Sequence, residues 1–199
     1  MSSLPPQSSQ NDADRWDVIA QPYAAWLEGA SGGIGKAFNR LVTDHLLATL
    51  GDVQGKDILD VGCGEGHLAR ALVERGAHVW GIDAAPHMIE LAQAKEGAAR
   101  ITYTVGDMTT ALPYDSRRFD LVVCNLVLMN VADISFPISE VARVLKPYAK
   151  FVFSIVHPCF FEALGEWLDL DTPHTALRFT RRYSEPFRSL KHVGGLSSE

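Results

Sequence analysis

An apolar run that leads directly into three alternate glycines constrains this chain more than any other feature of its sequence. Residues 58–61 are typical of a buried strand, Gly62, Gly64 and Gly66 follow, and a helical pattern begins at His67. Glycine adopts backbone conformations that other residues avoid, and it leaves room for a ligand to approach the main chain. A helix that begins at such a turn also presents unpaired N–H groups. The stretch therefore predicts a ligand-binding turn between a strand and a helix.

The residues around this turn indicate which kind of ligand it holds. A second apolar run, residues 78–82, ends in Asp83, where a carboxylate can accept hydrogen bonds from both hydroxyls of a ribose. Dinucleotide-binding turns follow the pattern GxGxxG, but here His67 occupies the position of the third glycine. Glu65 in the same turn disfavours a pyrophosphate, which a helix N-terminus would otherwise stabilise. A neutral or cationic nucleoside is favoured, and S-adenosylmethionine fits because it carries adenosine and a sulfonium without phosphate.

Length, charge and cysteine content limit the classes of protein to which the chain can belong. A chain of 199 residues with 47% hydrophobic content suits one domain with a substantial core. The net charge of −6 and the lack of a long basic run argue against nucleic acid as a partner. Three widely spaced cysteines predict neither a disulfide framework nor a zinc-binding pair, and they favour a cytoplasmic location. No apolar run approaches the ~18 residues that a membrane span requires, so we expect none.

The chain divides by composition into a tail and a domain. Residues 1–14 are rich in serine, proline, glutamine and asparagine, and we predict a disordered tail there. Residues 15–199 form the predicted single domain, with a core at 35–157 and an irregular C-terminal segment at 158–199. Apolar and aromatic residues between 16 and 27 predict one or two short helices, interrupted by Pro22.

Within the core, helical and strand patterns alternate. Helices are predicted at residues 35–50, 66–75, 86–96 and 137–145, the last with Ser135 as its N-cap. Strands are predicted at residues 57–61, 78–82, 101–105, 119–124 and 150–156. This order predicts an α/β fold. The nearly continuous apolar strands favour a parallel sheet buried on both faces, with ligands bound at the carboxyl ends of its strands.

Four motifs in this order resemble those of class I S-adenosylmethionine-dependent methyltransferases, especially the small-molecule group that includes the quinone-biosynthesis C-methyltransferases. The motifs are ILDVGCGEG at 58–66, GID at 81–83, GDM at 106–108, and FDLVV at 119–123 with RVLKP at 143–147. The resemblance covers about residues 35–157. It implies a Rossmann-like, doubly wound sheet with strand order 3-2-1-4-5. It also implies in-line transfer of a methyl group from S-adenosylmethionine to a small organic acceptor.

The resemblance also implies roles for individual residues. Asp83 would accept the ribose hydroxyls and Asp107 the adenine amino group, while Met108 and Ala84 would pack against the purine. Asp60 would support the glycine turn. The remaining residues expected to bind the cofactor are Gly62, Cys63, Gly64, Asn125 and Tyr23. Strand-end capping stays open as an alternative role for Asp60 and Asp107, as does helix packing for Tyr23.

The sequence departs from the family pattern in two places. Tyr148-Ala149 replaces a Gly-Gly turn, at a position expected to lie on the surface away from the cofactor. The residues after Val156 do not resemble a final helix and two good strands, so strands six and seven are predicted to be missing or shortened. A missing hairpin would leave the fifth strand as an edge, and an unpaired edge invites pairing with another chain. Residues 176–183 or a second subunit would then cover this edge, the latter in a homodimer.

Residues for the chemistry itself are harder to identify. His157, just beyond the fifth strand, is our candidate base for an acceptor that must lose a proton, and a structural hydrogen bond near Pro158 is its alternative role. Cys159 beside His157 has too few neighbouring ligands to predict a metal site. Two other functions stay open: a non-catalytic S-adenosylmethionine-binding protein or half of a methyltransferase complex, and an NAD(P)-dependent reductase, which the glycine spacing disfavours.

Overall fold

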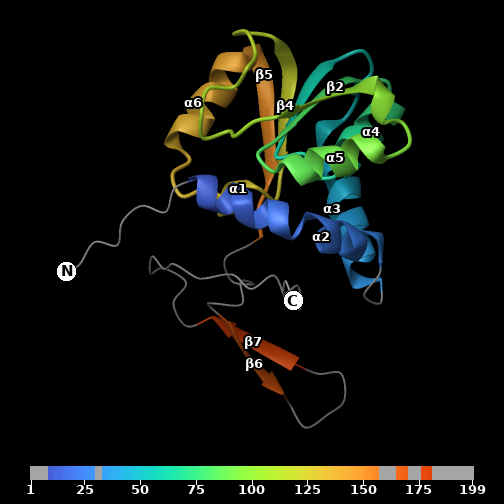
Figure 1. Ribbon diagram of the computed structural model, residues 1–199, viewed down its shortest axis with the longest axis vertical. Coiled ribbons are helices and arrows are strands. Elements are labelled where there is room, and N and C mark those ends of the chain that lie inside the picture. Colours follow the sequence, from blue (N-terminus) through green and yellow to red (C-terminus); the bar gives the residue numbers. More distant parts are fainter. Residues whose placement is uncertain (1–8, 30–32, 157–164, 170–175, 181–199) are drawn as a thin grey trace, which may run out of the picture. The chain divides into compact units, whose positions relative to one another are not determined.

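The computed structural model describes residues 9–29, 33–156, 165–169 and 176–180 (Figure 1). The chain divides into two compact units, one formed by Met1–Ser154 and one by Ile155–Ser197. The first unit ends within three residues of the predicted end of the core at residue 157. The assignment of residues 15–199 to a single domain stays a prediction.

The first unit is built on a parallel sheet of five strands. Its strands are β1 (Asp57–Val61), β2 (His78–Asp83), β3 (Ile101–Val105), β4 (Phe119–Asn125) and β5 (Leu145–Ser154). They lie in the order β3-β2-β1-β4-β5, and every neighbouring pair is parallel. This confirms the predicted order 3-2-1-4-5. The order reverses between β1 and β4, where a doubly wound sheet opens a crevice for ligands beyond the carboxyl ends of its strands.

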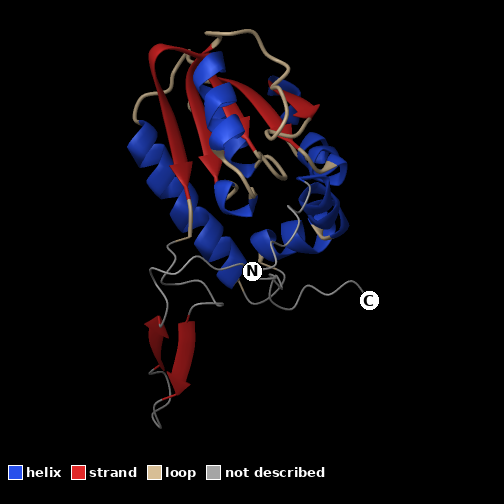
Figure 2. Ribbon diagram, turned by 90° about the vertical axis from the view of Figure 1, so that its left-hand side faces the viewer, coloured by secondary structure: helices blue, strands red, loops and turns tan. Residues whose placement is uncertain are grey.

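Helices precede the sheet and connect its strands. The helices are α1 (Ser9–Val18), α2 (Ala20–Glu28), α3 (Ile34–Leu50), α4 (His67–Glu74), α5 (Pro86–Ala94) and α6 (Ser135–Val144), with short 3-10 turns η1 (Ala98–Arg100) and η2 (Leu128–Asn130). Figure 2 shows helices on both sides of the sheet. The predicted helices of the core are all present, with ends that differ by at most two residues.

The N-terminal helices differ from the prediction in two ways. Helix α1 begins at Ser9, inside the segment predicted as a disordered tail, and the rest of that tail lies outside the described residues. The interruption between α1 and α2 falls at Ile19 rather than at Pro22. Pro22 lies in the first turn of α2, where a backbone N–H has no intrahelical partner and its loss costs nothing.

Helix α6 begins differently from the prediction that Ser135 caps it. Ser135 is the first helical residue, and Ile134 takes the cap position without a side-chain hydrogen bond. The Asp133 carboxylate instead accepts a hydrogen bond from the Ser135 N–H at 2.8 Å. A carboxylate beside a helix N-terminus is also favoured by the helix dipole. Asp133 therefore performs the stabilising role that we assigned to Ser135.

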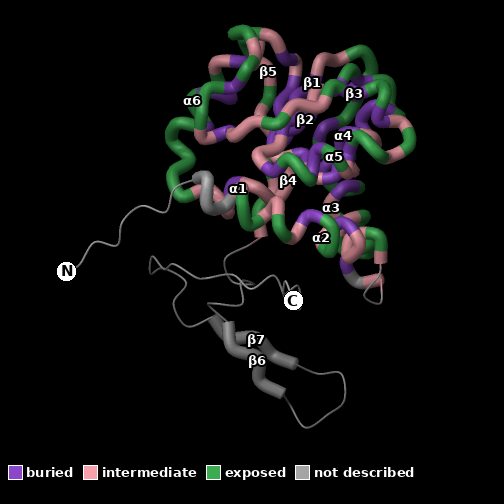
Figure 3. The backbone as a smooth tube through the Cα atoms, in the orientation of Figure 1, coloured by how far each residue is buried: buried purple, intermediate pink, exposed green. Residues whose placement is uncertain are grey.

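The alternation of side chains along the strands builds a core on each face of the sheet. Ile58 of β1 and Val123 of β4 belong to a cluster that also contains Leu47 of α3 and Leu72 of α4. Their sequence neighbours point to the other face, where the cluster includes Leu59, Val61, Val122, Cys124, Val141 and Val144. Figure 3 shows buried positions concentrated along β1, β2 and β4. Because both faces are covered, apolar residues predominate in the central strands.

Strand β5 begins five residues earlier than predicted and contains the replaced Gly-Gly turn. The pairing of β4 with β5 shifts in register between Phe119 and Leu121. Tyr148 in this stretch has a positive φ of 64° and is fully exposed. The turn therefore lies on the surface, as predicted, and Tyr148 takes a backbone conformation that glycine adopts more readily.

The second unit contains one described hairpin. Strand β6 (Gly165–Asp169) pairs antiparallel with β7 (Ala176–Thr180), and Leu168 lies opposite Leu177. Strands six and seven are thus present as five-residue strands that pair with each other. Among the described residues neither belongs to the five-stranded sheet, in which β5 is the last strand on its side.

Replacing Tyr148 with glycine should stabilise the protein, because a residue with a Cβ loses about 1 kcal/mol in the left-handed region. Chemical denaturation would measure the free energy of unfolding. Tyr148→Ala is the control, since it removes the exposed ring but keeps the Cβ, and it should gain no stability. Equal stability of the two variants would show that the turn is unstrained.

Candidate functional site

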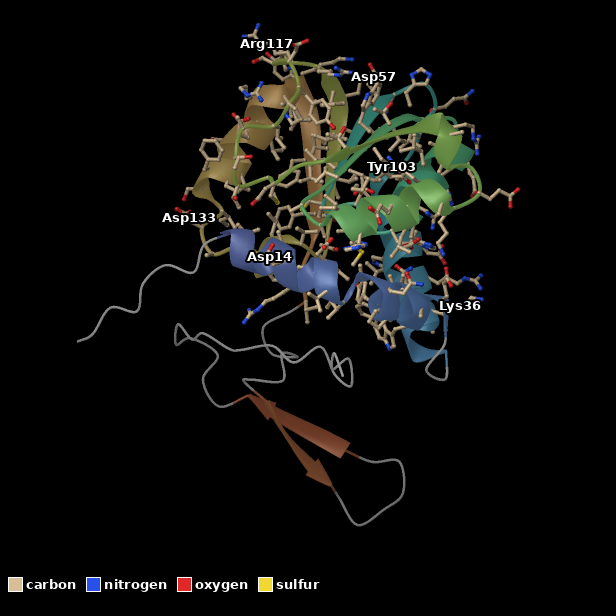
Figure 4. All side chains as sticks on the ribbon, in the orientation of Figure 1. Asp14, Lys36, Asp57, Tyr103, Arg117 and Asp133 are labelled. Atoms are coloured by element: carbon tan, nitrogen blue, oxygen red, sulfur yellow. The ribbon has the colours of Figure 1, made fainter. Side chains whose placement is uncertain are left out.

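A cavity of about 430 Å3 opens at the carboxyl ends of the strands. All ten residues predicted to bind a cofactor line it: Tyr23, Asp60, Gly62, Cys63, Gly64, Asp83, Ala84, Asp107, Met108 and Asn125. Figure 4 shows Asp57 and Arg117 at one end of the sheet and Asp133, which also lines the cavity, toward the other. His157, the predicted base, lies outside the described residues.

The glycine turn lies close against neighbouring side chains. The N–H groups of Gly62 and Cys63 both donate to the carbonyl oxygen of Ile82, at 2.8 and 3.1 Å. Gly62 has a φ of +70°, and a Cβ at this position would lie 2.3 Å from Cγ2 of Val127. A larger residue would therefore force both the backbone and the opposite wall of the cavity to shift.

Asp83 connects the ends of two strands. Its Oδ2 accepts a hydrogen bond from the Gly64 N–H at 2.8 Å, and its Oδ1 accepts one from the Ala85 N–H at 3.0 Å. Burial raises the pKa of Asp83, the charge of Asp107 adds to the rise, and these backbone hydrogen bonds oppose it. A carboxylate offers about four acceptor positions, so Asp83 keeps acceptor capacity toward the cavity.

Asp107 follows β3 and makes the capping hydrogen bond that the sequence left open as its alternative role, while adenine binding stays a prediction. Its Oδ1 accepts a hydrogen bond from the Thr109 N–H at 2.8 Å, which caps the turn after the strand. Asp107 also lines the cavity beside Met108, which is buried in the core below it. The capping hydrogen bond thus fixes the Asp107 carboxylate where the chain leaves β3 and lines the cavity.

Asp60 is the most unusual polar group of the site. Only 1% of its surface is exposed, and neither carboxylate oxygen makes a hydrogen bond of normal geometry with a described residue. Burial raises its pKa to about 7, the charge of Asp83 adds to this rise, and the nearby Ala69 N–H opposes it. Asp60 therefore makes no hydrogen bond of normal geometry to the described glycine turn, and its support of that turn stays a prediction. It is a buried carboxylate without a counter-charge, lining the cavity.

The loop after β4 forms another wall of the cavity. Asn125 Oδ1 accepts a hydrogen bond from the Ser154 hydroxyl, and the Leu126 N–H donates to the Ser154 carbonyl oxygen at 3.1 Å. Leu126 has a positive φ of 59°, which is strained for a residue with a branched side chain. Contacts between the ends of β4 and β5 thus hold Leu126 against the cavity.

Helices α1 and α2 cover the site through aromatic side chains. Trp16, Tyr23 and Leu27 line the cavity, and the rings of Trp16 and Tyr23 meet edge to face at 5.2 Å. The Asp17 carboxylate fixes α1 to α5, because it accepts hydrogen bonds from the His87 N–H and from His87 Nδ1 at 2.7 and 2.6 Å. This helical wall is therefore attached to the sheet domain through α5.

Several lining residues were not predicted from the sequence. Phe38 and Asn39 of α3, Phe136 and Pro137 of α6, and His67 of α4 contribute to the wall. His67 was readable from the sequence as a direct neighbour of the glycine turn, but we used it only to exclude a dinucleotide. The other four depend on how α3 and α6 pack against the sheet, which no local pattern reveals.

The charge of the cavity wall is predominantly negative. Asp60, Asp83, Asp107, Asp133 and Glu65 line it, and among the described residues no lysine or arginine does. Glu65 is 6% exposed and its carboxylate is paired with Arg70 at 2.7 Å, behind the wall. The arrangement suits a ligand that carries positive charge.

The described residues contain no group of three or more histidine, cysteine, aspartate or glutamate side chains arranged to hold a metal ion. Within the same residues, no helix combines the length and apolar character needed to cross a bilayer.

Comparison with known proteins places this geometry in context. The profile of a family described as "Methyltransferase domain" matches residues 59–153. A malonyl-[acyl-carrier protein] O-methyltransferase of Erwinia billingiae is 32% identical over 89% of this chain and 67% of its own length. A ubiquinone biosynthesis O-methyltransferase of Alkalilimnicola ehrlichii is 35% identical over 60% of this chain and 49% of its own. The chain thus spans from about half to two thirds of these relatives.

A solved structure shows the same fold. The S-adenosylmethionine-dependent methyltransferase of Mesorhizobium loti superposes with a TM-score of 0.62 and 32% sequence identity, over 70% of this chain and 63% of that one. The two curated relatives above are O-methyltransferases, whereas the resemblance pointed to a group that includes C-methyltransferases.

Replacing Asp60 with asparagine should change how stability depends on pH. The pKa of Asp60 is about 7 in the folded protein and 3.8 in its ordinary state, so folding favours the protonated form. Its contribution is complete below about pH 4 and is lost as the pH rises to about 7, with a loss on the order of a few kcal/mol. The Asp60→Asn variant should lack this loss in urea denaturation of the ligand-free protein.

Asp120→Asn provides the matched control, because the pKa of Asp120 is lowered, mainly by its hydrogen bond with Lys146. The stabilising effect of Asp120 is present at neutral pH and is lost as the pH falls. Asp120→Asn should therefore be less stable than the wild-type protein at neutral pH, and this difference should shrink as the pH falls. If the free energy of unfolding depended on pH in the same way in the wild-type and Asp60→Asn proteins, the pKa of Asp60 would not be raised by folding.

Proposed function

Because the chain belongs to the class I S-adenosylmethionine-dependent methyltransferases, we propose that it transfers a methyl group from S-adenosylmethionine to a small organic acceptor. The observation that carries this proposal is the convergence of ten residues, predicted from separate parts of the sequence, on one cavity at the carboxyl edge of the sheet. An in-line displacement at the methyl carbon is the reaction that this cofactor supports.

The residues of the cavity fit the cofactor in charge and shape. Asp83 would bind the ribose, and Asp107 the adenine amino group, with Met108 and Ala84 against the purine. Two features support this fit. The unpaired Asp60 carboxylate suits the cationic methionine end, and at Gly62 an added Cβ would collide with the opposite wall.

The methionine end would lie along the turn and the loop after β4. Gly62, Cys63, Gly64 and Asn125 line the cavity and would contact the methionine end, as would Tyr23 of α2, which also lines the cavity. The Tyr23 pKa is raised, mainly by burial and further by the charge of Glu65. Tyr23 therefore stays neutral and can act as a hydrogen-bond donor beside the turn.

The bound cofactor would supply the activated methyl group. The chain would hold the acceptor in line with that methyl group and exclude water from the cavity. Aromatic residues from α1, α2 and α3 form the apolar part of the wall, namely Trp16, Tyr23 and Phe38. His157 stays our proposed base for an acceptor that must lose a proton.

The nature of the acceptor follows from its surroundings and from the relatives. A cavity with aromatic walls and without lining lysine or arginine among the described residues favours a small organic molecule over nucleic acid. Two curated relatives are named as O-methyltransferases, which makes oxygen the first acceptor atom to test. We also retain a cytoplasmic location as a prediction.

A non-catalytic role is the second candidate function. The chain spans only 49% of the ubiquinone-biosynthesis relative, so a cofactor-binding protein or one half of a complex would also fit. Production of S-adenosylhomocysteine with a panel of phenols and carboxylic acids distinguishes these roles. A nicotinamide-dependent reductase is disfavoured, because Glu65 and the uncompensated acids would repel a pyrophosphate.

A homodimer through the edge of β5 belongs to the same proposal. Among the described residues, β5 is the last strand on its side of the five-stranded sheet. The side chain of Phe153 in this strand is 48% exposed. An unpaired edge with an exposed aromatic side chain invites pairing with a second copy.

Asp83→Ala should weaken the binding of S-adenosylhomocysteine by about 1.5 to 3 kcal/mol, as expected for hydrogen bonds to a charged group. Titration calorimetry measures the loss. Asp120→Ala, at the opposite end of the sheet, should bind normally. If Asp83→Ala also bound normally, the ribose would have to lie elsewhere.

Light scattering tests the dimer. The wild-type protein should have twice the mass of one chain, and Phe153→Lys should have the mass of one, because a charge at the strand edge opposes pairing. Tyr148→Lys, at the exposed turn of the same strand, is the control and should remain dimeric. A monomeric wild-type protein would contradict the proposal.

A further inference from the structure

The cavity wall contains two polar side chains, His67 and Asn39, to which the proposed adenosine contacts assign no role. His67, the first residue of α4, lines this wall immediately after the glycine turn. Asn39 of α3 lines the cavity as well. His67 is half-buried, and its ring makes no hydrogen bond or ion pair with any side chain that the structure describes. A histidine that faces a cavity with both ring nitrogens available can serve a ligand.

His67 is also exceptional in charge. The other titratable side chains on the cavity wall are carboxylic acids, Cys63 and Tyr23, none of which can carry a positive charge. The neighbouring Arg70 is occupied by Glu65 through two hydrogen bonds. Among the described lining residues, His67 alone can become a cation. The cofactor that we propose carries one anionic group, the carboxylate of its methionine moiety, and this group requires a donor or a cation.

We propose that His67 binds the methionine carboxylate of the cofactor, and thereby distinguishes the complete cofactor from adenosine compounds that lack an amino-acid group. This inference rests on the proposed function. The position supports it, because His67 opens an eight-residue helix whose N-terminal end favours an anion. Asp83 and Asp107 would hold the adenosine, and His67 would contact the methionine end, which lies along the neighbouring glycine turn in the proposed arrangement.

The environment of His67 gives the proposal a measurable protonation effect. Burial lowers the pKa of His67, and the charge of Arg70 lowers it further. The carboxylates of Glu65, Glu74 and Asp44 act in the opposite direction. The ring is therefore neutral at pH 7 in the empty site. A bound carboxylate raises the pKa of a histidine, so binding should take up a proton. Affinity should therefore fall as the pH rises from the lowered pKa of His67 in the free protein toward its raised pKa in the complex.

The test compares S-adenosylhomocysteine with methylthioadenosine, which keeps the adenosine and the thioether but has no amino-acid group. His67→Ala should weaken binding of S-adenosylhomocysteine about tenfold or more, the effect of a lost charge-assisted hydrogen bond. Its affinity for methylthioadenosine should be nearly unchanged, which also shows that the variant is folded. His67→Gln keeps a donor, so it should recover part of the affinity without the proton uptake.

His78→Ala is the control, because His78 is exposed at the start of β2, where it contacts Asp57. It should bind both compounds like the wild-type protein. Proton uptake is measured by calorimetry in buffers of different ionisation enthalpy. An equal loss of both compounds in His67→Ala would make His67 a structural support of the turn and overturn the inference. Failure of the wild-type protein to bind either compound would instead overturn the proposed function, and the inference with it.

Discussion

The two hydrogen bonds that Asp83 accepts from the backbone organise the candidate site. The Gly64 N–H belongs to the turn after β1, and the Ala85 N–H belongs to the turn after β2. One carboxylate thereby ties two neighbouring connections at the carboxyl edge of the sheet. The Ile82 carbonyl oxygen adds two further bonds to the same glycine turn. The turn is thus fixed mainly by the end of β2, and its conformation follows from the parallel register in which Val61 pairs with Ile82.

This arrangement concentrates negative charge where burial makes it costly. Burial and the charge of Asp83 raise the pKa of Asp60, and burial and the charge of Asp107 raise the pKa of Asp83. No lysine or arginine among the described residues lines the cavity to offset these acids. Buried carboxylates without partners destabilise a folded protein. The same charge favours a ligand that brings its own cation, because such a ligand relieves the repulsion as it binds. The site is therefore least stable when empty, and part of the binding free energy of a cationic cofactor comes from that instability.

The sequence predicted the parts of the structure that local patterns determine. β1 and β3 begin and end at the predicted residues, and Tyr23, outside the strand motifs, lines the cavity as expected. The errors fall where distant contacts decide. Helix α1 begins earlier than predicted and lies against α5, to which the Asp17–His87 hydrogen bonds join it across seventy residues. Phe38 and Phe136 reach the cavity through helix packing, which leaves no short-range signal.

The strand ends on one side of the cavity and helices α1 and α2 on the other are held in place by different kinds of interaction. The strand ends and their turns are held by backbone hydrogen bonds and by the sheet register, so the cofactor side of the site has little freedom. The opposite wall comes from α1 and α2, which are joined to α5 through side-chain contacts such as the Glu28–Lys95 ion pair. Surface contacts of this kind contribute little stability and tolerate substitution. The wall that contains Trp16 and Leu27 should therefore tolerate substitution better than the strand ends do.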